Sequence, residues 1–255
     1  MVIHGTDTLA YTATALSLML AGFGKPIVMT GSQLPLAFPR SDARHNLIDS
    51  ISCAVARRDC GRGPMLRELA VCFGGWLFRG NRIRKDHTSR YSAFGSPNYP
   101  PLAEIGVDIV WSEGLLLEED GSNYRPHFEL ERNVIRVPVV PGSDPRVCYG
   151  DLVGRGVRGI VLEAFGVGNT PDTFDAGWLP WLREQRARGL SVHMTTQCRG
   201  GSLQPMLYRS GMAMTEMGIT STTQVMTPEA AVVKLMLALE NPDIRMDVSL
   251  AGEPV

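Results

Sequence analysis

Segments with helical periodicity alternate with short apolar runs along the first half of the chain. Leu9, Ala13, Leu16 and Leu20 recur at intervals of three or four residues, which predicts an amphipathic helix that Gly22 ends. An apolar run at residues 2–3 precedes this helix. The same analysis predicts three further elements in the first half, namely strands at 27–29 and 69–73 and a helix at 46–56. Strand, polar turn, helix and strand in this order form a βαβ unit.

The second half of the chain alternates in the same way. It predicts strands at residues 134–139, 159–162 and 190–194, and helices at 179–189 and 228–239. Thr227 has the position and chemistry of an N-cap for the last helix. Strands that alternate with helices form mostly parallel sheets that helices cover on both faces.

The predicted fold is therefore α/β with two domains. The larger, N-terminal domain covers residues 1–120 and has a mostly parallel sheet with flanking helices. A polar, acidic and glycine-containing run from Glu118 to Pro126 is typical of a linker, which we place at residues 121–132. Residues 133–255 then form a smaller, Rossmann-like α/β domain. Because the first apolar run has almost nothing in front of it, we expect the first strands of the N-terminal domain to be missing.

Composition and charge exclude several classes of protein. The 255 residues are 44% hydrophobic and 20% charged, and 25 basic against 26 acidic side chains leave no positive charge for binding nucleic acid. No apolar stretch approaches the ~20 residues that a membrane-spanning helix needs. The five cysteines include no Cys-x-x-Cys pair and follow no signal peptide, which favours a reducing, cytoplasmic location. The histidines show no ligand spacing, so we expect no metal.

Ligands of α/β proteins bind at the carboxyl ends of strands, and the turn at residues 4–8 lies at such an end. The simpler interpretation of this turn is that Asp7 or Thr8 caps the following helix. Lys85 ends a basic, glycine-containing loop, which composition alone explains equally well as an exposed surface. A lysine that has lost a proton can act as the base for a hydroxyl group, and a carboxylate can orient it. Thr6, Asp7 and Lys85 are therefore candidate catalytic residues, although Lys85 lies far from the other two in the sequence.

Several segments form a recognisable set of motifs that spans nearly the whole chain. They lie at residues 2–13, 25–35, 40–42, 79–85, 94–98, 166–169, 196–198 and 226–235. This set resembles the asparaginase/glutaminase family, in particular its cytosolic, type I asparaginase branch. The resemblance implies an amidohydrolase that converts L-asparagine to L-aspartate and ammonia through an acyl-enzyme on a threonine, without metal or cofactor. It also implies that Thr6, Lys85 and Asp7 form a relay, and that Thr6 and Asp7 help to bind the substrate.

The resemblance also marks a piece that the sequence does not contain. In the family the nucleophilic threonine lies in a Thr-Gly-Gly-Thr-Ile turn, and the same segment carries an aspartate and a serine that hold the substrate. No Thr-Gly-Gly-Thr occurs in the 255 residues. We therefore expect an N-terminally incomplete gene sequence or a fragment, without appreciable asparaginase activity. Two other hypotheses stay open: a non-catalytic chain that binds or stabilises family subunits, and a nucleotide-binding protein, although Gly-x-Gly-x-x-Gly and P-loop motifs are both missing.

The resemblance further implies a homodimer or homotetramer in which the partner completes the active site, with Asn169 as a candidate contact. Cytosolic bacterial members have a second, regulatory asparagine site, and two of its positions hold Glu163 and Arg84 here. Glu163 reverses the charge opposite a ligand carboxylate, so we expect no allosteric activation, although Asn169 and Cys198 are retained. Cys198 is more simply interpreted as a small, buried residue.

Overall fold

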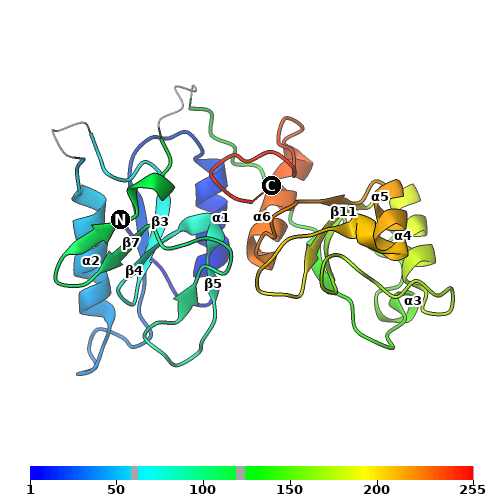
Figure 1. The fold of residues 1–255 in the computed structure, drawn as a ribbon, viewed down its shortest axis with the longest axis horizontal. Coiled ribbons are helices and arrows are strands. Elements are labelled where there is room, and N and C mark those ends of the chain that lie inside the picture. The colour runs from blue at the N-terminus through cyan, green and yellow to red at the C-terminus, as the bar shows by residue number, and fades with distance from the viewer. Residues whose placement is uncertain (59–62, 119–123, 255) are drawn as a thin grey trace. The chain divides into compact units, whose positions relative to one another are not determined.

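The computed structural model describes residues 1–58, 63–118 and 124–254, which form two compact units (Figure 1). The first unit contains Met1–His127 and Leu250–Glu253, and the second contains Phe128–Ser249 and Pro254. Each unit is built on its own sheet, which confirms the two-domain α/β fold. The first residues of the predicted linker, 121–123, lie outside the described part of the chain, and residues 124–132 form no helix or strand.

The domain to which the four residues Leu250–Glu253 belong differs from the domain predicted from the sequence. The prediction assigns them to the second domain, but they group with the first unit. The reason is that two of their carbonyl groups accept hydrogen bonds from Asn81 and Arg82, which are buried side chains of the first unit.

The sheet of the first unit has six strands in the order β1-β2-β3-β4-β7-β8. The strands are β1 (Val2–Ile3), β2 (Ile27–Thr30), β3 (Leu69–Phe73), β4 (Trp76–Arg79), β7 (Ala103–Ile105) and β8 (Ile109–Trp111). The first three are parallel, and β4, β7 and β8 pair antiparallel, so the sheet is mixed rather than mostly parallel. The change of direction comes from Gly74 and Gly75, whose φ angles of 60° and 83° form a tight turn that joins β3 directly to β4.

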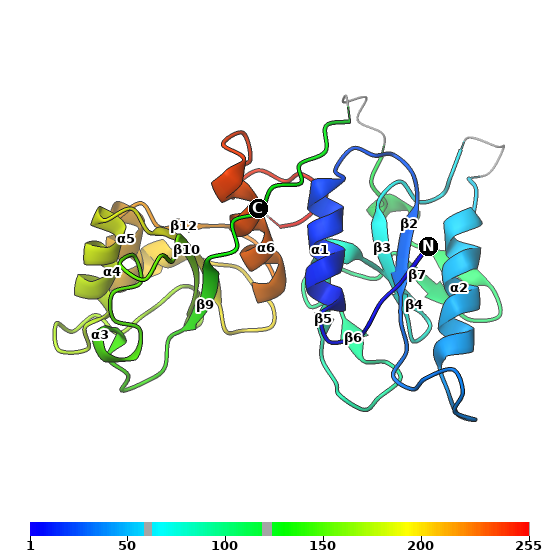
Figure 2. The ribbon, with the colours of Figure 1, turned by 180° about the vertical axis from the view of Figure 1, so that it is seen from behind.

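Two helices cover opposite faces of this sheet, α1 (Leu9–Met19) and α2 (Ala43–Val55) (Figures 1 and 2). Successive residues of a strand point to opposite faces, so Met29 packs in the cluster with α1 and its neighbour Val28 packs in the cluster with α2. Both predicted helices are confirmed, although α2 begins three residues earlier than predicted.

A small hairpin follows β4. The 3-10 turn η2 (Gly80–Arg82) leads into β5 (Arg84–Lys85), which pairs antiparallel with β6 (Phe94–Gly95). A second 3-10 turn, η3 (Glu113–Leu115), follows β8. The hairpin is not part of the six-stranded sheet, so it is free to project a side chain away from the sheet plane.

The sheet of the second unit has four parallel strands in the order β12-β11-β10-β9. The strands are β9 (Val134–Pro138), β10 (Gly159–Ala164), β11 (Ser191–Thr196) and β12 (Thr220–Ser221). The helices and 3-10 turn are α3 (Pro145–Cys148), α4 (Trp178–Ala187), η4 (Pro205–Leu207), α5 (Arg209–Glu216) and α6 (Pro228–Glu240). Helices α4 and α5 pack on one face through Trp178 and Met214, whereas α6 packs on the other.

The predicted cap of α6 is confirmed, because Thr227 Oγ1 accepts a hydrogen bond from the backbone N–H of Ala230 at 3.2 Å. Helix α5 was not predicted from the sequence, since its eight residues cover little more than two turns. Within the described ranges, no helix is both long enough and apolar enough to cross a membrane.

His193 is a fully buried titratable group in the second sheet. It lies on β11, and its Nδ1 is 2.9 Å from Thr220 Oγ1. Burial, and to a lesser degree the positive charge of Lys234, lowers the pKa of His193 from 6.5 to about 3. The imidazole is therefore neutral in the folded protein over a range in which an exposed histidine would take up a proton.

We expect acid to destabilise the fold through His193. The unfolded chain binds a proton as the pH falls below 6.5, whereas the folded protein binds it only near pH 3, so stability is fully present above pH 6.5 and is lost as the pH falls between these values. This single group adds a slope of up to about 1.4 kcal/mol per pH unit. Urea unfolding between about pH 4 and pH 7 measures the slope, which should be shallower in His193→Gln. The exposed His45 provides the control variant His45→Gln, and equal slopes in all three proteins would contradict the assignment.

Candidate active site

The turn at residues 4–8 connects β1 to α1. The backbone N–H of His4 donates to the Thr30 carbonyl at 2.8 Å, which holds the turn beside the end of β2. Gly31 permits this close approach, because a Cβ atom there would lie 2.3 Å from the His4 carbonyl oxygen. Thr8 occupies the N-cap position of α1, but its side chain makes no capping hydrogen bond. The polar side chains of the turn are therefore available for other contacts.

Lys85 reaches the same place from the β5–β6 hairpin. It pairs with Phe94 across the hairpin, and Ile83, two residues before it, is fully buried. Ile83 and Phe94 belong to the same hydrophobic cluster as Leu9, the first residue of α1. Hydrophobic packing thus fixes the hairpin against the start of α1, directly after the polar turn.

The three side chains predicted from the sequence meet at this point. Lys85 Nζ donates to Thr6 Oγ1 at 2.8 Å and to Asp7 Oδ1 at 2.8 Å. The side chain of Lys85 is 23% exposed and that of Asp7 is 93% exposed, so the group opens to solvent on the Asp7 side. The hydrogen bond from Lys85, followed by its positive charge, holds the pKa of the Asp7 carboxyl below its ordinary value of 3.8. Asp7 therefore binds Lys85, and the interpretation of this residue as a simple helix cap is wrong.

This arrangement can move a proton. A hydroxyl group lies within hydrogen-bond distance of an amine, and a carboxylate orients that amine, which is the geometry of an activated hydroxyl or water. In the part of the chain that the structure describes, no three His, Cys, Asp or Glu side chains are grouped so as to hold a metal ion.

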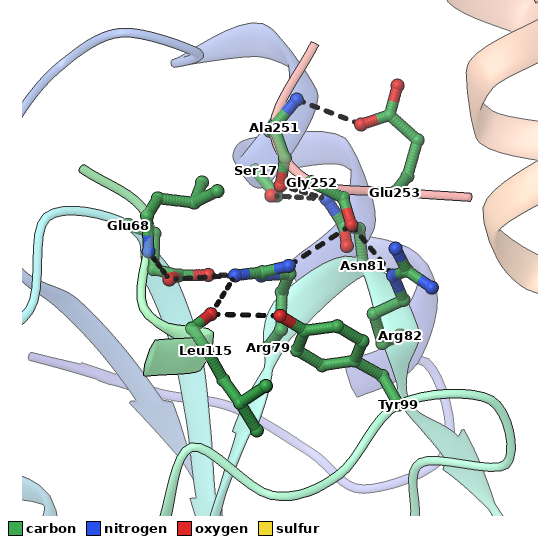
Figure 3. A network of polar contacts seen from close by, with 11 residues as sticks. Ser17, Glu68, Arg79, Asn81, Arg82, Tyr99, Leu115, Ala251, Gly252 and Glu253 are labelled. Carbon is green, nitrogen blue, oxygen red and sulfur yellow. Dashed lines mark hydrogen bonds and ion pairs between the residues drawn. The ribbon is translucent and has the colours of Figure 1, made fainter. Parts of the chain in front are cut away.

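Two basic residues before Lys85, Arg79 and Arg82, are buried and Arg84 is half-buried, so the interpretation of this loop as an exposed surface is wrong. Arg79, Asn81 and Arg82 are 3%, 0% and 7% exposed (Figure 3). Arg79 forms an ion pair with the equally buried Glu68, with Nε and Oε2 2.5 Å apart. Both guanidinium groups lie over the ring of Tyr99, at 4.5 and 4.7 Å from its centre. Burial, and next the charge of Arg79, lowers the pKa of Arg82 to about 10.

Comparison with known proteins gives an independent observation. The family described as "Asparaginase, N-terminal" matches residues 1–116, and "Glutaminase/Asparaginase C-terminal domain" matches residues 133–249. The chain belongs to the asparaginase family. L-asparaginase 1 of Escherichia coli (strain K12) is 35% identical over 235 residues, which are 92% of this chain and 66% of that protein. The crystal structure of L-asparaginase I from Vibrio cholerae matches with a TM-score of 0.84 and 35% identity over 100% of this chain and 75% of the other.

The asparaginase-family chain spans only part of its relatives' length. It covers less than two thirds of Escherichia coli L-asparaginase 1, at 66%, and 42% of the mouse 60 kDa lysophospholipase, to which it is 36% identical over 248 residues. The two family models confirm the family membership predicted from the motifs.

Asn169 lies in the second unit of the asparaginase-family chain. Its Oδ1 accepts a hydrogen bond from Ser210 Oγ at 2.6 Å, and Ser210 Oγ accepts one from the backbone N–H of Thr170 at 3.2 Å. These residues line a cavity of about 550 Å³ together with Tyr208 and Arg209. Asn169 is thus held within its own unit, and its contact with a partner subunit stays a prediction.

Two positions expected in the regulatory site of the asparaginase family are engaged within their own units. Glu163 forms an ion pair with Arg136 on the neighbouring strand, with Oε1 and Nε 2.5 Å apart, and Arg84 is part of β5. Cys198 is exposed, so its interpretation as a buried residue is wrong, because it follows β11 after the strand has left the core. The loss of allosteric activation stays a prediction.

We expect the Asp7 carboxyl of the asparaginase-family chain to titrate below pH 3.8 in the folded protein. The pKa of Asp7 is lower in the folded than in the unfolded protein, so the contact with Lys85 stabilises the fold above pH 3.8. This stabilisation is lost as the pH falls through the pKa of the folded protein. In Lys85→Met the midpoint should return toward 3.8, since both causes of the shift come from Lys85. Carboxyl ¹³C NMR measures the midpoints, with Asp7→Asn for assignment. Asp247, whose pKa Arg245 lowers, is the control that should not move, and an unchanged Asp7 midpoint would refute the contact.

Proposed function

We propose that this chain is part of an enzyme that hydrolyses the side-chain amide of L-asparagine, and that Thr6, Asp7 and Lys85 are the proton relay of that enzyme. The observation that carries the proposal is the pair of 2.8 Å contacts from Lys85 Nζ to Thr6 Oγ1 and Asp7 Oδ1. Membership of the asparaginase family and the similarity to L-asparaginase 1 of Escherichia coli support the choice of substrate. The proposed reaction uses no metal and no other cofactor.

The proposed chemistry proceeds through an ester. A nucleophilic oxygen forms a bond to the amide carbon, the carbon–nitrogen bond breaks, and the nitrogen leaves as ammonia after it takes up a proton. Water then cleaves the ester and releases L-aspartate. Lys85 in its neutral form accepts a proton from the Thr6 hydroxyl, which in turn accepts one from the attacking group, and this proton is the one that the leaving nitrogen takes up. Asp7 stabilises the ammonium group that Lys85 carries after it accepts the proton. Thr6 and Asp7 also bind the substrate.

The proposed reaction also needs an acylating group. The 255 residues contain no Thr-Gly-Gly-Thr, the turn that the family resemblance assigns to the nucleophilic threonine. We propose that the chain by itself holds the relay without the nucleophile. The same observation favours a second candidate function, a non-catalytic chain that binds and stabilises other subunits of the asparaginase family.

We expect the 255-residue chain to release no ammonia from L-asparagine above background, because the relay has nothing to acylate. The test compares the purified chain with a longer version in which a family segment containing a Thr-Gly-Gly-Thr-Ile turn precedes Met1. The longer version should release ammonia. Activity of the 255-residue chain itself would contradict the proposal, and a folded but inactive longer version would favour the second candidate function.

In the active longer version, Lys85→Met should lower kcat by about 10²–10⁴-fold, because the Thr6 hydroxyl loses its proton acceptor. Lys85→Arg should be little better, since a guanidinium group stays protonated. Asp7→Asn should impair both kcat and KM. Lys25→Met is the matched control, because Lys25 is an exposed lysine of the same unit. Near-wild-type turnover by Lys85→Met would rule out the relay.

We further propose that the protein works as a homodimer or homotetramer in the cytoplasm, with Asn169 at the partner subunit. The free thiols Cys53, Cys72, Cys148 and Cys198 support a reducing location. On the surface of α2, the exposed residues Ile48, Ile51 and Val55 support non-specific association of the 255-residue chain when it is alone.

Size-exclusion chromatography with light scattering tests the proposed assembly. We expect the longer version to elute as a dimer or tetramer, because the resemblance implies an active site completed by the partner. The 255-residue chain should instead form polydisperse aggregates. A longer version that is active as a monomer would overturn the shared site.

A further inference from the structure

A polar junction joins the segments that carry the candidate site. Asn81, in η2, is fully buried, and its Nδ2 donates to Ser17 Oγ of α1 at 3.1 Å and to the Ala251 carbonyl at 2.8 Å (Figure 3). One side chain thus links α1, η2 and the residues Leu250–Glu253, which we call the C-terminal segment.

Buried arginines hold the C-terminal segment more firmly than Asn81 alone. The Gly252 carbonyl accepts hydrogen bonds from Arg82 Nε at 2.7 Å and from Arg79 Nη1 at 3.3 Å. The Glu253 carboxylate accepts from the backbone N–H groups of Leu250 and Ala251, at 2.9 and 2.8 Å, and so folds the segment into a compact turn. Two guanidinium groups of η2 and β4 therefore have an acceptor that comes from a distant part of the chain.

Short covalent paths lead from this junction to the candidate site. Lys85 follows Arg82 by three residues, and the fully buried Ile83 between them leaves the backbone little freedom. On the other side, Ser17 belongs to α1, which begins two residues after Asp7. A shift of η2 relative to α1 is therefore transmitted to the contact between the lysine and the turn.

We propose that the C-terminal segment positions Lys85. By binding Asn81 and Arg82 it holds η2 against α1, and this keeps the Lys85 amine on Thr6 and Asp7. Asn81 and Arg82 are then positioning residues. Their importance for catalysis rests on the proposed function, whereas the mechanical link does not.

The substitution Gly252→Ala tests the proposal with a single methyl group. A Cβ atom at Gly252 would lie 2.6 Å from Arg79 Nη1, so the methyl group pushes the segment away from the Arg79 guanidinium. Gly142→Ala is the matched control, because both glycines have a φ of +78° and nothing lies within 4 Å of a Cβ at Gly142. Asn81→Ala breaks the junction from the other side.

The readout is the acetylation rate of Lys85 relative to that of Lys25 in the folded protein, measured by mass spectrometry. The chain has three lysines, Lys25, Lys85 and Lys234, and the exposed Lys25 is the internal standard. We expect the ratio to rise about tenfold in Gly252→Ala and in Asn81→Ala, the factor for losing one charge-assisted hydrogen bond. It should not change in Gly142→Ala.

Leu66→Ala separates positioning from general loss of stability, because Leu66 is buried in the cluster on the α2 face of the sheet. An unchanged ratio in Gly252→Ala or in Asn81→Ala would overturn the proposal. An equal rise in Leu66→Ala or in Gly142→Ala would overturn it as well. The measurement uses no turnover, so an inactive enzyme does not affect it, and a negative labelling result leaves the test of hydrolysis intact.

Discussion

The close contact between η2 and helix α1 is the constraint on which the candidate site depends. Gly80 lies at this contact, where a Cβ atom would be 3.4 Å from the Ala13 carbonyl oxygen of α1 and only 2.3 Å from Leu69 Cδ2 of β3. Helix α1 follows the turn with Thr6 and Asp7, and η2 leads to Lys85, so this contact sets the reach of the lysine. A separation by the width of a methyl group would exceed what a hydrogen bond of 2.8 Å tolerates. The local polar chemistry thus depends on a hydrophobic packing distance.

The parts of the fold that the sequence predicts well are those with a strong period. The apolar run at residues 69–73 becomes β3 with the predicted bounds, and the cap of α6 is predicted from Thr227 alone. The antiparallel half of the first sheet is missed for two reasons. Strands β7 and β8 have three residues each, too few for a pattern with period two. The Gly74-Gly75 turn is informative only once both flanking runs are interpreted as strands.

The members of the candidate site could be predicted from the sequence, but their contacts could not. Motifs and the rule for strand ends select Asp7 and Lys85, whereas their 2.8 Å contact depends on how the chain packs between these residues, which lie 78 positions apart. The burial of Arg79 has the same cause. A basic run looks like a solvated surface until its partners are known, and these include Glu68, 11 positions away, and Gly252, 173 positions away. Nothing in local composition encodes such distant neighbours.

The place of Leu250–Glu253 in the first unit also determines when that unit is complete. A ribosome makes every strand from β1 to β8 and then the main part of the second unit, Phe128–Ser249, before it reaches these four residues. Until then Asn81 and Arg82 lack carbonyl acceptors that they have in the finished protein, and polar groups without partners are poorly tolerated in a core. The unit that emerges first during translation is therefore completed only after nearly all of the second unit has been made.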